Sequence, residues 1–388
     1  MKKIQSALVL LAISAVSVLV SFSGATAEEK KGSQNEEFRG ANVRSHGHPV
    51  ANLSDAPTPG SKQNQNAFVN NDDANAEMEW QKWNKANETN DRKAGIAGAR
   101  VLGSATSNPI IYHTGGAIGL YTGATQIIPV WVGDWSNATR KANWNSVLSN
   151  LVTSLGGSGS IDTPANVFNT NSLYFTTKNA AVTQLTWPTL TASAAIPANI
   201  RAAVGGIVPV SDADVATYIN RALTTGVITA PPVGTRAIYV YIGASNTRLS
   251  SGFGTAYCGW HTYGTLGARN IHYIAIQDFT NTYLRACAAQ TISPNGDAQL
   301  DAMASVLVHE IDEVITDPDI RTWYDARGAE NADKCAWSFG ITSLMQNGAK
   351  YNYTAPPKTG RNYLIQQNWL ASNQVTDTVT GSACVVTS

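Results

Sequence analysis

Residues 300–319 read LDAMASVLVHEIDEVITDPD, and this stretch predicts an amphipathic helix packed on a sheet. At 3.6 residues per turn, His309 and Glu313 lie together on one side of the helix. Proline disfavours helical backbone at the residue before it, so Asp317-Pro318 should end the helix. The opposite side is an apolar stripe made of Leu300, Met303, Ala304, Leu307, Ile311 and Val314.

The motif in this helix is His-Glu-x-x-Glu, which differs from the HExxH motif of zinc peptidases at Glu313. Because residues four apart can reach one ion from adjacent turns, His309 and Glu313 are candidate metal ligands. Glu310 stands where such enzymes keep the general base that takes a proton from metal-bound water. The further candidate oxygen ligands are Asp317, Asp319, Glu330 and Asp333. Zinc is the favoured metal, calcium is the alternative because most ligands are oxygens, and the competing interpretation is a solvated acidic face that includes Asp312.

The patterns upstream of this helix predict a layered α/β (α+β) domain, with a mixed sheet packed by helices. A buried strand over Gln126–Trp135 precedes an apolar helical pattern that stops at Gly156-Gly157. A second helix should begin at Ser211, where Ser-x-x-Asp forms a capping box. Further strands are expected at Leu173–Thr177, Ala237–Gly243 and Asn270–Phe279. We assign all of these to one main domain over residues 108–388.

The N-terminus predicts export. Two lysines, an apolar run over about Ala7–Val20 and the small residues Ala25-Thr26-Ala27 form a signal peptide over residues 1–27. The run is too short for a membrane anchor. Residues 28–107 are polar and poor in branched aliphatics, so we expect a disordered segment or a pro-segment. The mature protein should be extracellular or periplasmic.

The amino-acid composition limits the classes of binding partner that we expect. Of 388 residues, 43% are hydrophobic and 14% charged, and lysine plus arginine equals aspartate plus glutamate at 27 each. This balance gives no basic surface for nucleic acid or for a membrane. Four cysteines suit two disulfides in an oxidising compartment, and the sequence leaves their three pairings open.

Several short stretches resemble the plant EXORDIUM and phosphate-induced protein 1 family over about residues 110–340. They are YHTGG at Tyr112, IPVWVGDW around Pro129, YCGWH at Tyr257 and SPNGDAQLD at Ser293. HEIDEVITDPD, WYDARGAENADKCAW and YLIQQNWL resemble microbial members of the same broad group. The resemblance implies that plant members lack the His-Glu pair, and it favours Asp333, in NADKCAW, as the third ligand.

The order of strands and helices is also similar to that of zincin catalytic domains. In a metzincin the third ligand falls ten residues after the first, which is Asp319 here. The family-like segments also favour one cysteine pairing. We predict Cys258 with Cys287, which flank a strand pair, and Cys335 with Cys384.

The other histidines are assigned structural roles. His261 lies close to Cys258, and we favour a hydrogen-bonded structural histidine there over a ligand. His113 and His272 should be packing or hydrogen-bonding residues. His46 and His48 could reach a metal only as part of an inhibitory pro-segment. The sequence contains no GxSxG motif for a serine nucleophile.

Two functions of different classes follow. One is a secreted metallopeptidase or other metallohydrolase that acts on an unidentified extracellular substrate. The other is a non-enzymatic extracellular or cell-wall-associated protein in which the helix is scaffold. A bound zinc ion with an open cleft over Glu310 would favour the enzyme, whereas a closed, metal-free helix would favour the scaffold.

Overall fold

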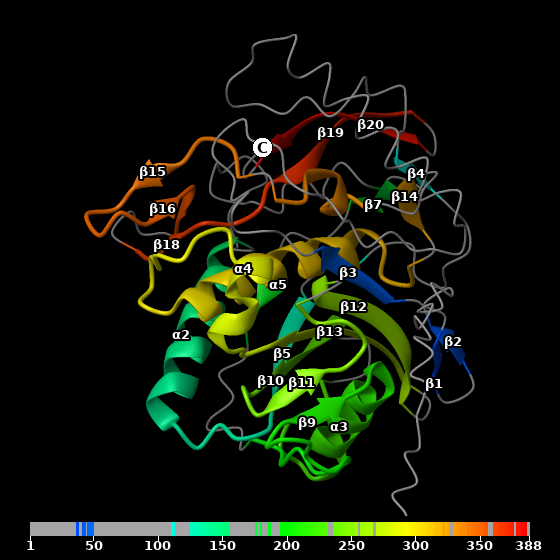
Figure 1. Ribbon diagram of the computed structural model, residues 1–388. Helices are drawn as coiled ribbons and strands as arrows, with labels where there is room; N and C mark the ends of the chain where they lie inside the picture. Colours follow the sequence, from blue (N-terminus) through cyan, green and yellow to red (C-terminus); the bar gives the residue numbers. More distant parts are fainter. Residues whose placement is uncertain are drawn as a thin grey trace, which may run out of the picture.

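The computed structural model of the chain (Figure 1) describes residues 36–38, 41–43, 45–49, 110–112, 121, 125–155, 175–176, 179–180, 185–187, 195–231, 236–254, 257–266, 269–320, 322–325, 330–337, 339–355, 360–375 and 378–385. Within these residues, no helix is long and apolar enough to cross a membrane.

A six-stranded sheet organises the domain, in the order β3-β12-β13-β10-β5-β8. The four strands β13 (Arg269–Gln277), β10 (Arg236–Gly243), β5 (Thr125–Val132) and β8 (Leu185–Thr186) run parallel. β12 (Tyr257–Leu266) is antiparallel to β13, and β3 (Ser45–Pro49) is antiparallel to β12. The mixed sheet therefore confirms the predicted fold class.

Helices cover both faces of this sheet (Figure 1). Tyr241 of β10 packs against Tyr218 of α3 (Asp212–Thr224). Its neighbours across the register are Ala275 and then Trp260 of β12. The next residue on β12, His261, points to the other face and contacts Glu310 of α5 (Ala298–Thr316). Hence α3 and α5 lie on opposite faces, and α2 (Ala138–Leu155) contacts α5.

Most predicted elements are present with shifted ends. The helix predicted after the first strand is α2, and its buried residues are Trp144, Val147, Leu148, Leu151, Val152 and Leu155. The capping box at Ser211 is formed with Asp214. Within the strand expected at Leu173–Thr177, the described residues form β6 (Phe175–Thr176). The sequence predicted no strand at 257–266, where the motif YCGWH begins β12.

The remaining elements are short strands and helical turns. They are β1 (Glu36–Phe38), β2 (Ala41–Val43), β4 (Ile110–Tyr112), β7 (Asn179–Ala180), β9 (Val208–Val210), β11 (Thr247–Leu249), η3 (Asn281–Tyr283), α4 (Leu284–Cys287), β14 (Trp323–Asp325), η4 (Asp333–Cys335), β15 (Ser343–Leu344), β16 (Lys350–Tyr351), β17 (Tyr353–Thr354), β18 (Asn362–Tyr363), β19 (Asn368–Val375) and β20 (Thr378–Val385). A four-stranded sheet of β14, β4, β20 and β19 stands apart from the main sheet.

A disulfide joins β12 to α4. Cys258 and Cys287 are bonded, with Cα atoms 5.4 Å apart, which confirms the first predicted pairing. Cys335 is disulfide-bonded as well. The side chain of its predicted partner, Cys384, lies outside the described residues, so that pairing stays a prediction.

Gly259 brings α5 close to β12. A Cβ atom at this position would lie 2.5 Å from Cγ1 of Val306 and 3.4 Å from Oε1 of Glu310. The first distance is far inside normal contact, so any side chain here would push the helix outward. This close approach places the middle of α5 against the strand that carries His261.

Candidate metal centre

The middle of α5 is buried on all sides. His309, Glu310, Asp312 and Glu313 each have 0% of their surface exposed. The interpretation of a solvated acidic face is therefore wrong. Ionisable groups this deep must be paired, protonated or bound to a metal, because an isolated charge is costly away from water.

Asp333 lies beside the His309–Glu313 pair of the HExxE motif. His309 Nε2 lies 3.1 Å from Glu313 Oε1 and 3.5 Å from Asp333 Oδ1. Asp333 belongs to η4, and its backbone N–H donates to Glu313 Oε1 over 3.1 Å. These three residues offer ligand atoms within 4.8 Å of one another.

His261 forms a second group around the same glutamate. Its Nδ1 lies 3.0 Å from Glu310 Oε2 and 3.4 Å from Glu313 Oε2, and its Nε2 lies 3.6 Å from Glu330 Oε2. His261, Glu310 and Glu313 again bring ligand atoms within 4.8 Å. The two histidines thus come from a strand and a helix, and Glu313 is common to both groups.

The histidine-to-carboxylate distances in both groups are compatible with a divalent ion such as zinc. Ligands about 2.0 to 2.1 Å from a tetrahedral ion lie about 3.3 to 3.4 Å apart. The distances from His309 Nε2, at 3.1 and 3.5 Å, bracket that value. So do the distances from His261 Nδ1, at 3.0 and 3.4 Å. Imidazole nitrogen with carboxylate oxygen is also a ligand set that zinc accepts, so the residues present fit such an ion.

The carboxylates outnumber the imidazoles, and this excess shifts their pKa values. Burial and the charge of Glu313 raise the pKa of Asp333 to about 7. Burial and repulsion from Glu313 raise the pKa of Glu330 well above its ordinary value. Burial raises the pKa of Glu310 too. Protons on these groups are therefore one way to balance the buried charge, and a divalent cation is another.

Opposing effects set the pKa values of His261 and Glu313. Burial lowers the pKa of His261, but hydrogen bonding and the charges of Glu310 and Glu313 outweigh it and raise the pKa to about 9. For Glu313 the signs are reversed. Burial alone would raise the pKa of this carboxylate, but the neighbouring imidazoles lower it below its ordinary value. Glu313 is thus the carboxylate that stays ionised at the centre of the cluster.

Gln366 fixes the proton position on His309. Its side-chain oxygen accepts from the backbone N–H of Trp337 over 3.1 Å, and its Nε2 donates to the carbonyl of Ala332 over 2.8 Å. In this orientation Nε2 also lies 3.0 Å from His309 Nδ1 and donates to it. Burial lowers the pKa of His309 and Glu313 raises it well above its ordinary value, but a donor at Nδ1 opposes a second ring proton. We assign a neutral ring with its proton on Nε2.

The other predicted oxygen ligands lie around this centre in different roles. Asp317 Oδ1 accepts from the backbone N–H and the hydroxyl of Thr322, over 2.7 and 2.6 Å. Asp319 Oδ1 lies 2.9 Å from His272 Nε2, and the hydroxyl of Tyr121 lies 2.5 Å from the Nδ1 of that histidine. Glu330 lies beside His261. Asp317 and Glu330 belong to neither three-residue group and remain predicted ligands.

The sequence favoured a hydrogen-bonded structural role for His261, and the structure places its Nδ1 within hydrogen-bonding distance of Glu310. Sequence reasoning missed Gln366. The signal for His261 was its strand: residues alternate between faces, so His261 shares its face with Gly259, whose missing side chain admits α5. Gln366 carries no such signal, because its role depends on the fold bringing residue 366 beside η4. His113 lies outside the described residues.

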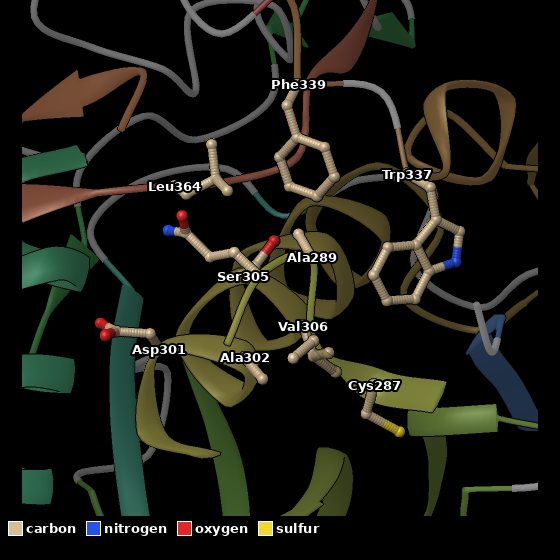
Figure 2. A pocket seen from close by; sticks show the side chains of 11 residues that line it. Cys287, Ala289, Asp301, Ala302, Ser305, Val306, Trp337, Phe339 and Leu364 are labelled. Carbon is tan, nitrogen blue, oxygen red and sulfur yellow. The ribbon is translucent and has the colours of Figure 1, made fainter. Parts of the chain in front are cut away.

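A recess lies one helical turn away, toward the N-terminus of α5 (Figure 2). It is small and partly open to solvent, and its wall includes Ser305, Val306 and Cys287. Trp337, Phe339 and Leu364 close its other sides. None of the candidate ligands is among the described residues that line it.

Comparisons with known proteins agree on one group. Residues 110–379 match the model of the phosphate-induced protein 1 conserved region. The chain is 39% identical over 90 residues to protein EXORDIUM-like 3 of Arabidopsis thaliana, covering 20% of this chain and 26% of that protein. It is 31% identical over 87 residues to protein EXORDIUM-like 5 of the same plant, covering 20% of this chain and 24% of that protein. The chain thus matches about a quarter of these relatives' length, and no solved structure matches it significantly.

Proposed function

Since this chain belongs to the phosphate-induced protein 1 family, we propose that it is an exported metalloprotein of that family with the residues of a metal-dependent hydrolase. A divalent ion, zinc in preference to calcium, would be held by His309, Glu313 and Asp333. The observation that carries the proposal is the geometry of that group, whose spacings from His309 Nε2 fit a tetrahedral ion.

The surrounding residues have roles that suit hydrolysis. When bound, the ion would supply Lewis acidity and make a bound water more acidic. Glu310 would accept the proton of that water, and its raised pKa favours keeping the proton for a leaving group. His261 would orient Glu310 through the 3.0 Å contact. Glu313 adds negative charge where HExxH enzymes have a second histidine, so the ion would be a weaker Lewis acid and turnover slow.

Zinc binding at His309 Nε2 requires one rearrangement. The ring proton must move to Nδ1, where it needs an acceptor. The side-chain amide of Gln366 would have to turn its oxygen toward Nδ1 and give up its present bonds to Trp337 and Ala332.

A second function is favoured by a different observation. His309, Glu310 and Glu313 are fully buried, and catalysis needs access for a substrate. If the site stays closed, the ion would be structural and the protein a non-enzymatic extracellular or cell-wall-associated one. The two functions share the metal and differ in turnover.

Two variants separate them. Glu310→Gln should retain the ion, and on a panel of unstructured protein substrates it should lose any zinc-dependent hydrolysis that the wild type shows. His309→Ala should lose both the ion and hydrolysis. A wild type that holds zinc and shows no hydrolysis above the Glu310→Gln background would establish the structural role instead.

A further inference from the structure

The outer edge of β12 is covered by a strand from the far N-terminus. β3 pairs with β12 in antiparallel register, with Pro49 opposite Tyr257, His48 opposite Gly259, Gly47 opposite Trp260 and His46 opposite His261. β3 is the last strand on that side of the sheet. Figure 1 shows it beside both β12 and α5, and it contacts both.

β3 is an edge strand of the sheet, held by its pairing with β12 and by contacts with α5. It is five residues long, it pairs with one neighbour, and residues 50–109 separate it along the chain from β4. A short strand paired on one side can open at low free-energy cost compared with the sheet interior.

Once β3 leaves, the backbone N–H and C=O groups on the outer side of β12 lose their partners. Such an edge is a template for any extended polypeptide, because main-chain hydrogen bonds provide the affinity whatever the side chains are. The edge also lies next to the candidate metal centre, since the segment opposite β3 contains His261.

We propose that the outer edge of β12, from Tyr257 to Thr262, is a docking site for an extended polypeptide and that residues 45–49 are its built-in occupant. The pairing register between β3 and β12 defines which polypeptide segments can dock. The docked strand runs antiparallel to β12 and places a glycine opposite Trp260, a large residue that is 2% exposed. Docking needs no metal ion. Only the reading of the docked polypeptide as a substrate depends on the proposed hydrolase function.

The test uses the full chain with a specific protease site inserted after Gly60. Cleavage leaves the N-terminal piece held only by its contacts. A synthetic peptide of residues 43–51 is then added in excess, and hydrogen exchange of β12 amides is followed. The peptide should displace the N-terminal piece on size exclusion. After that piece and the peptide are both removed, alternate β12 amides should exchange roughly tenfold faster or more, and adding the peptide back should restore protection.

Two matched peptides test for a strand ladder. One carries Ser45→Pro with Gly47→Pro, and the other carries His46→Pro with His48→Pro. Only alternate residues of an antiparallel strand donate N–H groups to its partner, and proline lacks that donor. One peptide should therefore lose binding and the other should keep most of it.

Three results would overturn the proposal: exchange at β12 that is the same with and without the N-terminal piece, a cleaved piece that excess peptide cannot displace, or equal binding of both proline peptides. None of these readouts involves metal or turnover. Their failure would leave the metal proposal standing, and failure of the metal proposal would leave these results unaffected.

Discussion

His261 Nδ1 lies 3.0 Å from Glu310 Oε2, and both side chains are fully buried. The contact joins residues 49 positions apart and ties the antiparallel strand of the sheet to the centre of α5. His261 also faces Glu313 and Glu330, at 3.4 and 3.6 Å.

Replacing His261 should therefore be costly for the fold itself. His261→Ala leaves buried carboxylates without their imidazole, a change that costs about 3 to 5 kcal/mol when one partner of a buried pair is removed. The free energy of unfolding from denaturant titration of metal-free protein measures this. Because Glu310→Gln removes the opposing charge, the double variant should recover part of the loss. A single variant within 1 kcal/mol of wild type would mean that the pair behaves as a surface pair.

Gly259 should tolerate no side chain while Val306 is present. Gly259→Ala places a Cβ 2.5 Å from Val306 Cγ1, and overpacking of this kind costs about 1 to 3 kcal/mol. Val306→Ala removes the clashing methyl groups, so the effects of the two variants should be strongly non-additive. Additive losses in thermal unfolding would show that α5 does not pack on β12 at this point.

The sequence predicted the elements that depend on local pattern. The helix ending near Asp317, α2 with its six buried residues and the Ser211 capping box all follow from spacing and caps. The grouping of His309, Glu313 and Asp333 followed from helix geometry and a family-like segment. In contrast, β3, the second group around His261 and the Gln366 contact depend on which distant segments pair. Residues 46 and 261, or 309 and 366, carry no periodic signal that would join them.

Gln366 offers a test of how His309 binds metal. Gln366→Glu supplies an acceptor for a proton on Nδ1 without any turn of the side chain, and carboxylate partners of this kind change metal affinity about 10-fold to 100-fold. Zinc affinity measured by competition with a chelator should rise. The metal-free protein should become less stable, because another carboxylate joins the buried cluster. Unchanged or weaker zinc binding would show that Nε2 of His309 is not the ligand atom.

Zinc affinity and the stability of the metal-free protein should change with pH in opposite directions. The raised pKa of His261, about 9, means that the metal-free fold prefers the protonated ring. Its stabilisation is full below the ordinary histidine pKa of about 6.5 and is lost as pH rises through about 9. Asp333, with a pKa of about 7, adds a loss between its ordinary pKa and 7. The metal competes with these protons, so zinc affinity should increase over the same range.

Both predicted directions can be tested by measuring the free energy of unfolding at pH 6 and pH 9, each with zinc and with a chelator. The chelated protein should be less stable at pH 9, and the stabilisation due to zinc should be larger there. Zinc stabilisation that shrinks from pH 6 to pH 9 would contradict ligation by these residues. Arg201→Lys is a suitable control, because this exposed arginine pairs with Asp214 of α3, far from the ligands in sequence.

The most direct measurement is the metal content of the purified full-length protein, by elemental analysis after dialysis against zinc and calcium together. We predict at least one zinc ion per chain in the wild type and in Glu310→Gln, and none in His309→Ala at matched folded content by circular dichroism. Two ions per chain would place the second in the His261 group. A wild type without zinc, or His309→Ala with as much zinc as the wild type, would contradict a metal centre on α5.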